Sequence, residues 1–104
     1  MEIKELIQPV VGFAWDKGNI SKNWIKHRVS PSECEDVFFN RPLVEIDHEH
    51  SQQEERYFAY GITNTGRLLF IVFTLRKNKI RVISAKKMIK KERRIYYEKI
   101  KENT

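Results

Sequence analysis

The chain has 104 residues, the size of one ordinary domain. Forty per cent of these are hydrophobic, enough for one modest core, and no apolar run approaches the roughly 20 residues that a membrane helix needs. These features exclude a multidomain enzyme and a membrane-spanning protein. We expect one domain at residues 13–104, preceded by an N-terminal extension at residues 1–12. The lone Cys34 cannot form an internal disulfide bond, which fits a cytoplasmic protein.

The formal net charge of +6 is unevenly distributed. Residues 1–60 contain seven Lys or Arg against eleven Asp or Glu, whereas residues 61–104 contain thirteen against three. The stretch RKNKIRVISAKKMIKKERR, residues 76–94, holds ten Lys or Arg and a single acid, Glu92. We interpret it as a basic face that binds nucleic-acid phosphates. The alternative is a solvated Lys-rich helix that only aids solubility.

The first expected elements are a short extended piece at residues 13–15 and a helix over residues 19–27. Asp16 precedes this helix and can cap it, because a carboxylate accepts hydrogen bonds from the first helical N–H groups. Three side chains recur at i, i+4 and i+7, the spacing of one helical face, and we expect that face to point inward. They are Ile20, Trp24 and His27.

A second helix is predicted from the sequence SPSE at residues 30–33. Ser30 can cap it, the following proline suits its first turn, and Glu33 can bond back to the cap. The sequence NRP at residues 40–42 then ends the helix. The residues expected on its buried face, at i, i+3 and i+4, are Cys34, Val37 and Phe38.

The rest of the chain predicts strands and a terminal helix. The expected strands cover residues 43–47, 56–62, 67–75 and 80–85, and the helix runs from residue 88 to about residue 102. Two N-terminal helices, an antiparallel sheet of three or four strands and a C-terminal helix together predict an α+β fold.

Several side chains could carry chemistry, and for each the residues alone also allow a structural role. His27 is of a type that titrates near neutral pH, but it can equally be a packed histidine at a helix end. Arg67 and Arg81 could be brought by adjacent strands to one sheet edge as a clamp for one phosphate. They could also be two exposed arginines with packed stems. Cys34, on an apolar helix face, reads as an inert buried thiol.

The sequence HEH at residues 48–50 raises the question of a metal site. On a strand, His48 and His50 would share a face and could meet one metal ion if a third ligand joined them. The surrounding HEHSQQEE reads instead as an exposed polar loop, and we expect no metal site there.

Three segments, in order along the chain, are similar to a known family. They are FAWDKGNISKNWIKHRVS, EERYFAYGITNTGRLLFIVFTLR and IRVISAKKMIKKERRIYYE, within residues 13–98. Their order and spacing resemble the BrnT family of bacterial toxins, from type II toxin–antitoxin modules. The matching positions are Trp15, Asp16, Asn23, Lys26, His27, Glu55, Arg56, Gly66, Arg67, Arg81, Ile83, Ser84, Ala85, Glu92, Arg93 and Tyr96.

The resemblance implies a RelE-like fold and a cytoplasmic ribonuclease that inhibits translation. It implies RNA cleavage without a metal ion or other cofactor. It also implies neutralisation by a BrnA-like antitoxin with a ribbon-helix-helix portion, through which the complex would contact DNA indirectly. A homodimer within that complex is compatible with the resemblance, and no membrane association is expected.

A mechanism consistent with the residues and with the resemblance uses the 2′-hydroxyl of the RNA as nucleophile. It needs proton transfer, worth about 10²–10⁴-fold in rate, and stabilisation of extra negative charge at phosphorus. The flanking phosphates we assign to Lys87, Lys90, Lys91 and Arg93. The expected catalytic residues are His27 for proton transfer, Arg67 and Arg81 as the phosphate clamp, Lys26 and Lys86 for electrostatic assistance, and Tyr96 for positioning or proton donation.

Two non-enzymatic alternatives use the same basic C-terminal helix. A nucleic-acid-binding protein would place this helix on the DNA or RNA backbone and would not need His27. A corepressor subunit would act mainly through its antitoxin, with the helix docked on an acidic antitoxin segment. Cleavage of RNA by the pure protein separates the enzyme from the nucleic-acid binder, whereas the corepressor role does not exclude toxicity.

Overall fold

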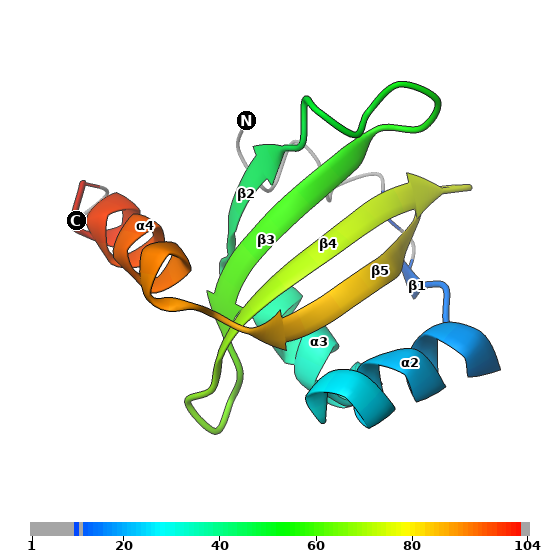
Figure 1. Ribbon diagram of the computed structural model, residues 1–104, viewed down its shortest axis with the longest axis horizontal. Coiled ribbons are helices and arrows are strands. Elements are labelled where there is room, and N and C mark those ends of the chain that lie inside the picture. Colours follow the sequence, from blue (N-terminus) through cyan, green and yellow to red (C-terminus); the bar gives the residue numbers. More distant parts are fainter. Residues whose placement is uncertain (1–9, 11, 103–104) are drawn as a thin grey trace.

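The structure is a computed structural model that describes Val10 and residues 12–102. Figure 1 shows one sheet with α3 behind it, α2 along one margin and α4 beside the other. The α+β class and the three helices predicted from the sequence are confirmed. In the described part of the chain no helix is long and apolar enough to span a bilayer. The elements in chain order are β1 (Gly12–Phe13), α2 (Lys17–His27), α3 (Pro31–Phe39), β2 (Leu43–Ile46), β3 (Arg56–Ile62), β4 (Leu68–Arg76), β5 (Lys79–Lys87) and α4 (Lys90–Glu102).

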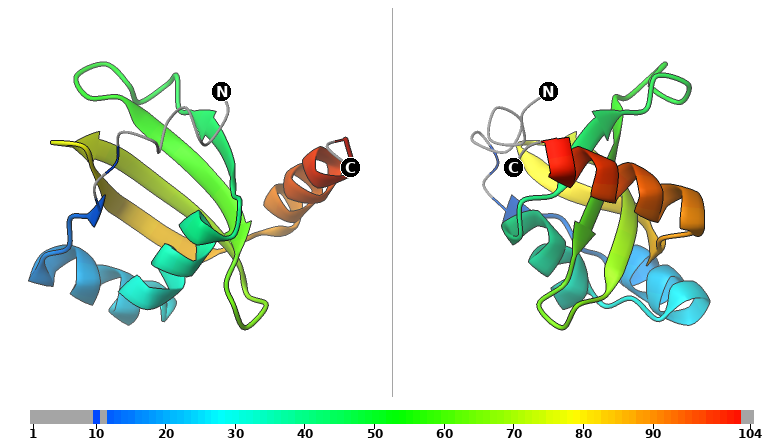
Figure 2. Two further views of the ribbon diagram at one scale, coloured as in Figure 1. Left: turned by 180° about the vertical axis from the view of Figure 1, so that it is seen from behind. Right: turned by 90° about the vertical axis from the view of Figure 1, so that its left-hand side faces the viewer.

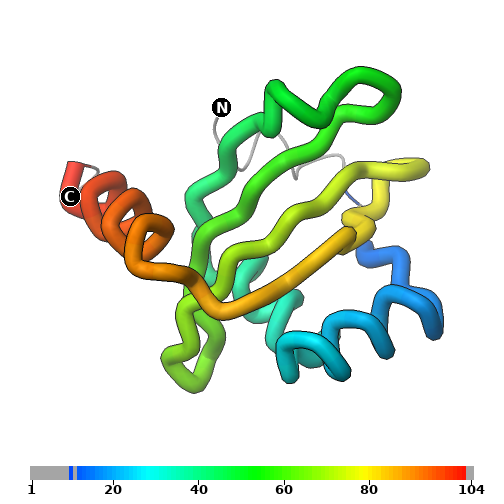
Figure 3. The backbone as a smooth tube through the Cα atoms, in the orientation of Figure 1, coloured from blue at the N-terminus to red at the C-terminus, as the bar shows by residue number. Residues whose placement is uncertain are grey.

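The strands form one five-stranded sheet in the order β1-β5-β4-β3-β2. From β2 to β5 every neighbouring pair is antiparallel, and Figure 3 traces this path. The two-residue β1 instead pairs in parallel with β5, with Gly12 opposite Lys79 and Phe13 opposite Ile80. The expectation of a wholly antiparallel sheet of three or four strands is wrong at this edge, because a two-residue strand has no periodicity by which to recognise it.

The predicted N-terminal extension, residues 1–12, lies outside the described residues apart from Val10 and Gly12. Val10 packs against the main core, and Gly12 opens β1. The φ angle of Gly12 is +153°, which side-chain-bearing residues rarely adopt, so glycine suits this entry to the sheet.

One face of the sheet is covered by α3, as the view from behind in Figure 2 shows. The predicted capping box forms at its start: Glu33 N–H donates to Ser30 Oγ at 3.2 Å, and Ser30 N–H donates to Glu33 Oε1 at 3.1 Å. α3 approaches β3 closely at Gly61, where an added Cβ would lie only 2.7 Å from Val37 Cγ1. The predicted buried face of α3 is confirmed, with Cys34, Val37 and Phe38 in the main core.

α2 lies along the edge of β5, and its buried residues are two asparagines rather than apolar side chains. Ala85 N–H donates to Asn23 Oδ1 at 3.0 Å, and Asn19 Nδ2 donates to the Val82 carbonyl at 3.3 Å. These side-chain amides satisfy backbone groups at a strand edge that β1 is too short to cover. α2 is therefore held by polar bonds to one strand.

The expectation that Ile20 and Trp24 point inward is wrong. Ile20 is 36% exposed and Trp24 is 47% exposed, with the Arg28 guanidinium 5.4 Å from the centre of the Trp24 ring. His27, expected on the same face, is partly buried. Apolar residues at i and i+4 share one face of a helix, but in α2 this face does not point toward the sheet. The face that carries Asn19 and Asn23 does, because these side chains can bond to the unpaired backbone groups of β5.

The second face of the sheet is only partly covered. α4 packs on it through a small cluster in which Tyr60, Met88 and Tyr96 are buried. The right-hand view of Figure 2 shows α4 crossing in front of this side of the sheet, while Figure 1 shows the rest of the face without a helix over it. The second face of the sheet is therefore covered by α4 at one end and has no helix over the rest.

Candidate nucleic-acid interface on the open sheet face

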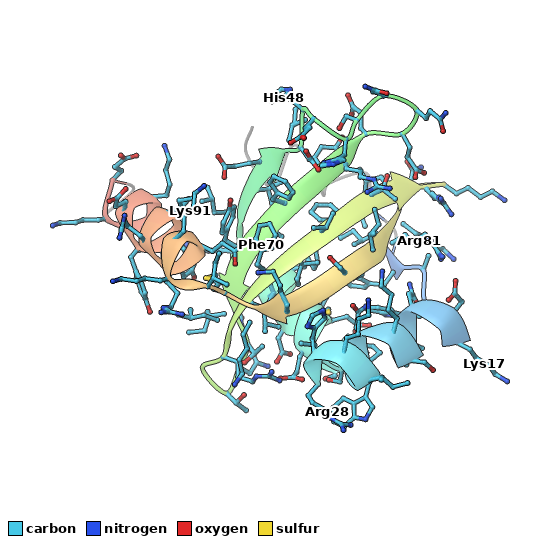
Figure 4. All side chains as sticks on the ribbon, viewed as in Figure 1. Lys17, Arg28, His48, Phe70, Arg81 and Lys91 are labelled. Atoms are coloured by element: carbon cyan, nitrogen blue, oxygen red, sulfur yellow. The ribbon has the colours of Figure 1, made fainter. Side chains whose placement is uncertain are left out.

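The second face of the sheet carries three rows of side chains, each row crossing β3, β4 and β5, of which Tyr60 lies under α4, Thr74 is buried and the others are partly exposed. We call these nine residues the open face. Figure 4 looks onto it, with Phe70 near the middle of the sheet and Arg81 toward the β1 margin. Cations lie in the first and third rows, and the middle row carries no charge. The rows are Tyr60, Phe70 and Lys86; then Phe58, Val72 and Ser84; then Arg56, Thr74 and Arg81.

Lys86 is held over the first row by two contacts. Its Nζ lies 2.8 Å from Glu92 Oε1 and 5.0 Å from the centre of the Phe70 ring. Glu92 Oε1 also accepts a hydrogen bond from Ile89 N–H at 2.9 Å, at the start of α4. The only acid of the basic stretch thus fixes a cation on the open face and caps the helix that borders it.

Arg81 is anchored at the other end of the open face. Its Nη1 lies 2.8 Å from Asp16 Oδ2, and Asp16 caps α2. The backbone N–H of Asn19, and then the Arg81 guanidinium, lower the pKa of the Asp16 carboxyl, so the carboxylate is ionised at neutral pH. The guanidinium is partly exposed and keeps further N–H donors for a ligand phosphate.

α2 adds cations beside the edge of the open face. Lys22 Nζ donates to the Ile83 carbonyl at 3.4 Å. Ile83 is the extra residue where the register between β4 and β5 shifts, so its carbonyl lies at an irregular point of the strand. Lys26 follows one helical turn after Lys22 and is exposed.

His27 lies at the end of α2 nearest the first row. Asn19 binds at Val82 and Asn23 at Ala85, so α2 and β5 run in the same direction. His27 is one turn beyond Asn23, about 6 Å along the helix, which corresponds to roughly two strand residues. Ideal helix and strand geometry would therefore put the backbone of His27 about level with Lys87, at the end of β5 that also carries Lys86.

Tyr96 belongs to the small core beneath α4 and is 5% exposed. Burial, and then the neighbouring Tyr97, raise the pKa of its phenol. It packs with Tyr60 and Met88, beside the partly buried Phe70. Of its two predicted roles, positioning α4 against the sheet fits this burial better than direct contact with a substrate.

Arg67 lies away from the open face. It precedes β4, whereas Arg81 pairs with Thr74, seven residues further on and about 23 Å along the strand. The predicted clamp of one phosphate by Arg67 and Arg81 is therefore wrong, because the register puts them at opposite ends of β4. Arg67 Nη1 instead binds Glu33 Oε2 and the Arg28 carbonyl oxygen, the latter at 3.0 Å, and so ties the β3–β4 turn to the α2–α3 connection.

Arg67→Gln is expected to lower the free energy of unfolding by about 2 kcal/mol at pH 7, since a partly buried charged pair is lost. Burial alone would raise the pKa of Glu33, but the Ser30 backbone N–H and the Arg67 guanidinium outweigh it and lower the pKa from 4.5. A lowered pKa stabilises the fold fully above about pH 4.5, and this stabilisation is lost as the pH falls through the lowered value. Denaturant unfolding of both proteins between pH 3 and pH 7 should show their curves converging at acid pH.

The control for this pair is Arg94→Gln, because Arg94 is exposed on α4. It should change the unfolding free energy by less than about 0.5 kcal/mol at either pH. A gap between wild type and Arg67→Gln that is as wide at pH 3 as at pH 7 would show that the ionised Glu33 carboxylate does not hold Arg67.

The basic residues of α4 and its approach lie beside the small core. Arg93 Nη1 donates to the Met88 carbonyl at 2.9 Å, which closes the first turn of the helix. Figure 4 shows Lys91 on α4, at the opposite margin of the molecule from Arg81. All the cations expected to hold flanking phosphates are exposed, and they are Lys87, Lys90, Lys91 and Arg93. Lys87 is opposite Leu69 of the main core, so its side chain lies on the face of the sheet opposite Lys86, whereas the other three lie on α4.

His48 and the cysteine lie apart from the open face, whereas His50 lines a pocket together with Arg56 of that face. His50 Nδ1 lies 3.0 Å from Asp47 Oδ2 in the β2–β3 loop, and Figure 4 shows His48 at the far margin of the molecule. Among residues 10 and 12–102 there is no group of three or more His, Cys, Asp or Glu arranged to hold a metal ion. Burial raises the pKa of the Cys34 thiol to about 12, so it is protonated and inert at neutral pH.

The open face also contains residues that the sequence reasoning did not single out for binding. Within the three rows they are Arg56, Phe58 and Phe70. Lys22, on α2, lies beside the open face. Alternation along β3 and β4 could have found the aromatic pair, because residues of even number in these strands share a face that the apolar core does not fill. No pattern in the sequence indicated that Lys22 lies next to β5.

A sheet covered by α3 on one face, and carrying cations and aromatic rings beside α4 on the other, defines a small basic α+β protein with a surface suited to a polyphosphate chain. A family model for the ribonuclease toxin BrnT of type II toxin–antitoxin systems matches residues 15–92. The chain therefore belongs to the BrnT family of ribonuclease toxins, and this membership implies an antitoxin partner.

Among solved structures, the chain is similar to a crystal structure of the Brucella abortus ribonuclease toxin BrnT. The TM-score is 0.55 at 17% identity, over 76% of this chain and 97% of that one. At this identity the likeness establishes the fold alone. A comparison with curated protein sequences gave no match.

Proposed function

We propose that the chain is an endoribonuclease that cleaves RNA on the open face without a metal ion and thereby inhibits translation in the cytoplasm. The observation that carries this proposal is the fixed position of Lys86 and Arg81 on the same face of β5, at the two ends of a partly apolar surface. Family membership supplies the class of activity. The relation to the RelE toxins is likewise part of the proposal.

The reaction begins with the 2′-hydroxyl of one nucleotide, which attacks the adjacent phosphorus. The bond from the 2′-oxygen to phosphorus forms as the bond from phosphorus to the 5′-oxygen breaks. The products are a 2′,3′-cyclic phosphate and a free 5′-hydroxyl. Because the nucleophile belongs to the RNA, the protein supplies proton transfer and positive charge.

His27 is the proposed proton-transfer group, because imidazole is the side chain suited to this task near neutral pH and α2 ends beside the end of β5 that carries Lys86. Lys86 stabilises the charge that develops on the phosphorane, with Lys26 beside it. Arg81 binds a phosphate further along the strand. The cations on and before α4, Lys87, Lys90, Lys91 and Arg93, hold the flanking RNA, and Tyr96 positions their helix.

The antitoxin is proposed to be a BrnA-like protein with a ribbon-helix-helix portion, through which the complex contacts DNA. An acidic segment of this partner would compete with RNA for the cations of the open face and of α4. α2 favours such a partner as well, since its sequence KGNISKNWIKH contains three lysines and no acid. Masking one surface would then be sufficient for inhibition.

The test is to incubate the pure protein with labelled RNA in excess chelator, beside the same sequence with every 2′-hydroxyl methylated. We expect the RNA to be cut into products with 2′,3′-cyclic phosphate ends and the methylated strand to stay intact. Lys86→Met protein, prepared identically, reports any contaminating ribonuclease. His27→Gln in the same assay reports proton transfer, provided that its melting temperature is unchanged.

Three results would contradict the proposal. They are cleavage that needs an added divalent cation, products with 3′-hydroxyl ends, or cleavage of the methylated strand. A shifted but intact RNA band in a native gel would instead support the non-catalytic nucleic-acid binder.

A further inference from the structure

The open face carries an aromatic pair that packs against the small core without being buried in it. Phe58 and Phe70 lie on neighbouring strands in adjacent rows, with ring centres 5.1 Å apart and planes inclined by 42°. The buried members of the small core are Tyr60, Met88 and Tyr96, and the two phenylalanines lie at its border, partly exposed. Each therefore leaves part of its ring available on a surface that is otherwise bordered by cations.

A phosphate-binding group lies directly above one of these rings. Lys86 Nζ is 5.0 Å from the centre of the Phe70 ring, and Glu92 holds it there at 2.8 Å. A phosphate that meets Lys86 therefore leaves its own nucleotide within reach of the Phe70 and Phe58 rings. Every nucleobase has a flat π-face that stacks on an aromatic side chain, whereas a base within a duplex has both faces covered by its neighbours.

We propose that Phe58 and Phe70 form a stacking platform for an unpaired base next to the phosphate at Lys86, so that the substrate is single-stranded RNA. This inference rests on the proposed function, and it adds the strand state that the site accepts. The cations bind any phosphate chain, single or double, so the platform is the feature of the open face that discriminates between them.

Among the other exposed aromatic residues, Trp24 also has a cation over its ring, the Arg28 guanidinium at 5.4 Å, but it lies on α2 and outside the open face. Phe39 is 76% exposed at the end of α3, on the face of the sheet opposite Lys86, and packs near Phe13. Tyr97 is 55% exposed on α4 and contacts Tyr96. Phe39 is thus a matched control, an exposed phenylalanine far from the proposed phosphate site.

The experiment measures binding separately from cleavage, with a fully 2′-O-methylated oligonucleotide that contains 2-aminopurine. Stacking quenches the 2-aminopurine fluorescence, and anisotropy gives the dissociation constant. Phe70→Leu keeps an apolar side chain of similar size in the small core, and we expect it to weaken binding about 10-fold and to abolish the quench. Phe70→Tyr should restore both, and Phe39→Leu should match wild type.

A duplex of the same sequence forms the second arm. Wild type and Phe70→Leu should bind it equally, because only phosphate contacts are available to a paired strand. Phe58→Leu repeats the test if Phe70→Leu melts at a lower temperature than wild type. The platform is refuted if Phe70→Leu and Phe58→Leu bind and quench as wild type does while Lys86→Met binds weakly, or if wild type binds the duplex as tightly as the single strand.

Failure of the proposed function would look different. If no RNA is cleaved but the methylated strand still requires Phe70 for binding and quenching, the platform stands and the enzymatic proposal does not.

Discussion

Lys86→Met is expected to slow RNA cleavage by about 10²–10³-fold, the usual effect of removing one preorganised donor that stabilises transition-state charge. Lys86 is the cation fixed most directly over the open face, by Glu92 at 2.8 Å and by the Phe70 ring at 5.0 Å. Its ammonium therefore needs little reorganisation when charge builds up on the phosphorane. The measurement is the single-turnover rate with saturating protein, so that weaker binding does not enter.

Lys86→Met should also lower the stability of the fold slightly. Glu92 loses its ion-pair partner but keeps the hydrogen bond from Ile89 N–H, so the unfolding free energy should fall by only about 1 kcal/mol. Lys86→Arg retains the charge and can still reach Glu92, and it should cleave within about 10-fold of wild type. A Lys86→Met protein that is folded and cleaves RNA at the wild-type rate would remove Lys86 from the mechanism.

The matched control is Lys99→Met. Lys99 is an exposed lysine whose Nζ lies 3.4 Å from Glu102 in the last turn of α4. Its removal lowers the total charge by the same amount but leaves the open face intact, so the cleavage rate should be unchanged at moderate ionic strength. An equal loss of activity in Lys99→Met would mean that overall charge, rather than the site, sets the rate.

Local sequence signals predicted the elements of this fold well. Ser30 and Glu33 form the expected capping box, and Cys34, Val37 and Phe38 face the core as their spacing indicated. β3 was predicted with its observed bounds, because residues 56–62 alternate clearly and are followed by a turn-forming sequence. In each case the information lies within a few residues of the chain.

Contacts between segments that are far apart in the sequence were not predicted. Arg67 and Arg81 each lie in or beside a correctly predicted strand, yet the register between β4 and β5 puts them at opposite ends. No property of either arginine encodes that register. The resemblance to BrnT identified the family, but it carried no information on which basic residues share a face.

The prediction of how α2 packs was wrong for a different reason. Its apolar residues at i and i+4 predicted an inward face, but the free edge of β5 needed hydrogen-bond partners that only polar side chains can supply. Asn19 and Asn23 have the same spacing of four residues as Ile20 and Trp24. A sequence pattern that counts only hydrophobic residues cannot detect such a face.

Asn23→Ala is expected to lower the free energy of unfolding by about 2 kcal/mol, or roughly 10 °C in melting temperature. Asn23 is 3% exposed, and its loss leaves the Ala85 N–H without its acceptor at 3.0 Å. The bond from Asn23 Nδ2 to the Asn19 carbonyl at 2.9 Å disappears as well. The higher helix propensity of alanine offsets less than about 1 kcal/mol of this loss.

The same change should also reduce RNA cleavage, because the bond between Asn23 and Ala85 holds the end of α2 that carries His27 against β5. Ser21→Ala is the control, since Ser21 is exposed on the same helix and its removal should alter stability by no more than about 0.5 kcal/mol. Thermal unfolding and single-turnover cleavage below the melting temperature measure the two effects. If Asn23→Ala is destabilised but cleaves at the wild-type rate, the bond between Asn23 and Ala85 is not what positions His27 for catalysis. If the variant is as stable as wild type, the asparagine edge does not hold α2 to the sheet.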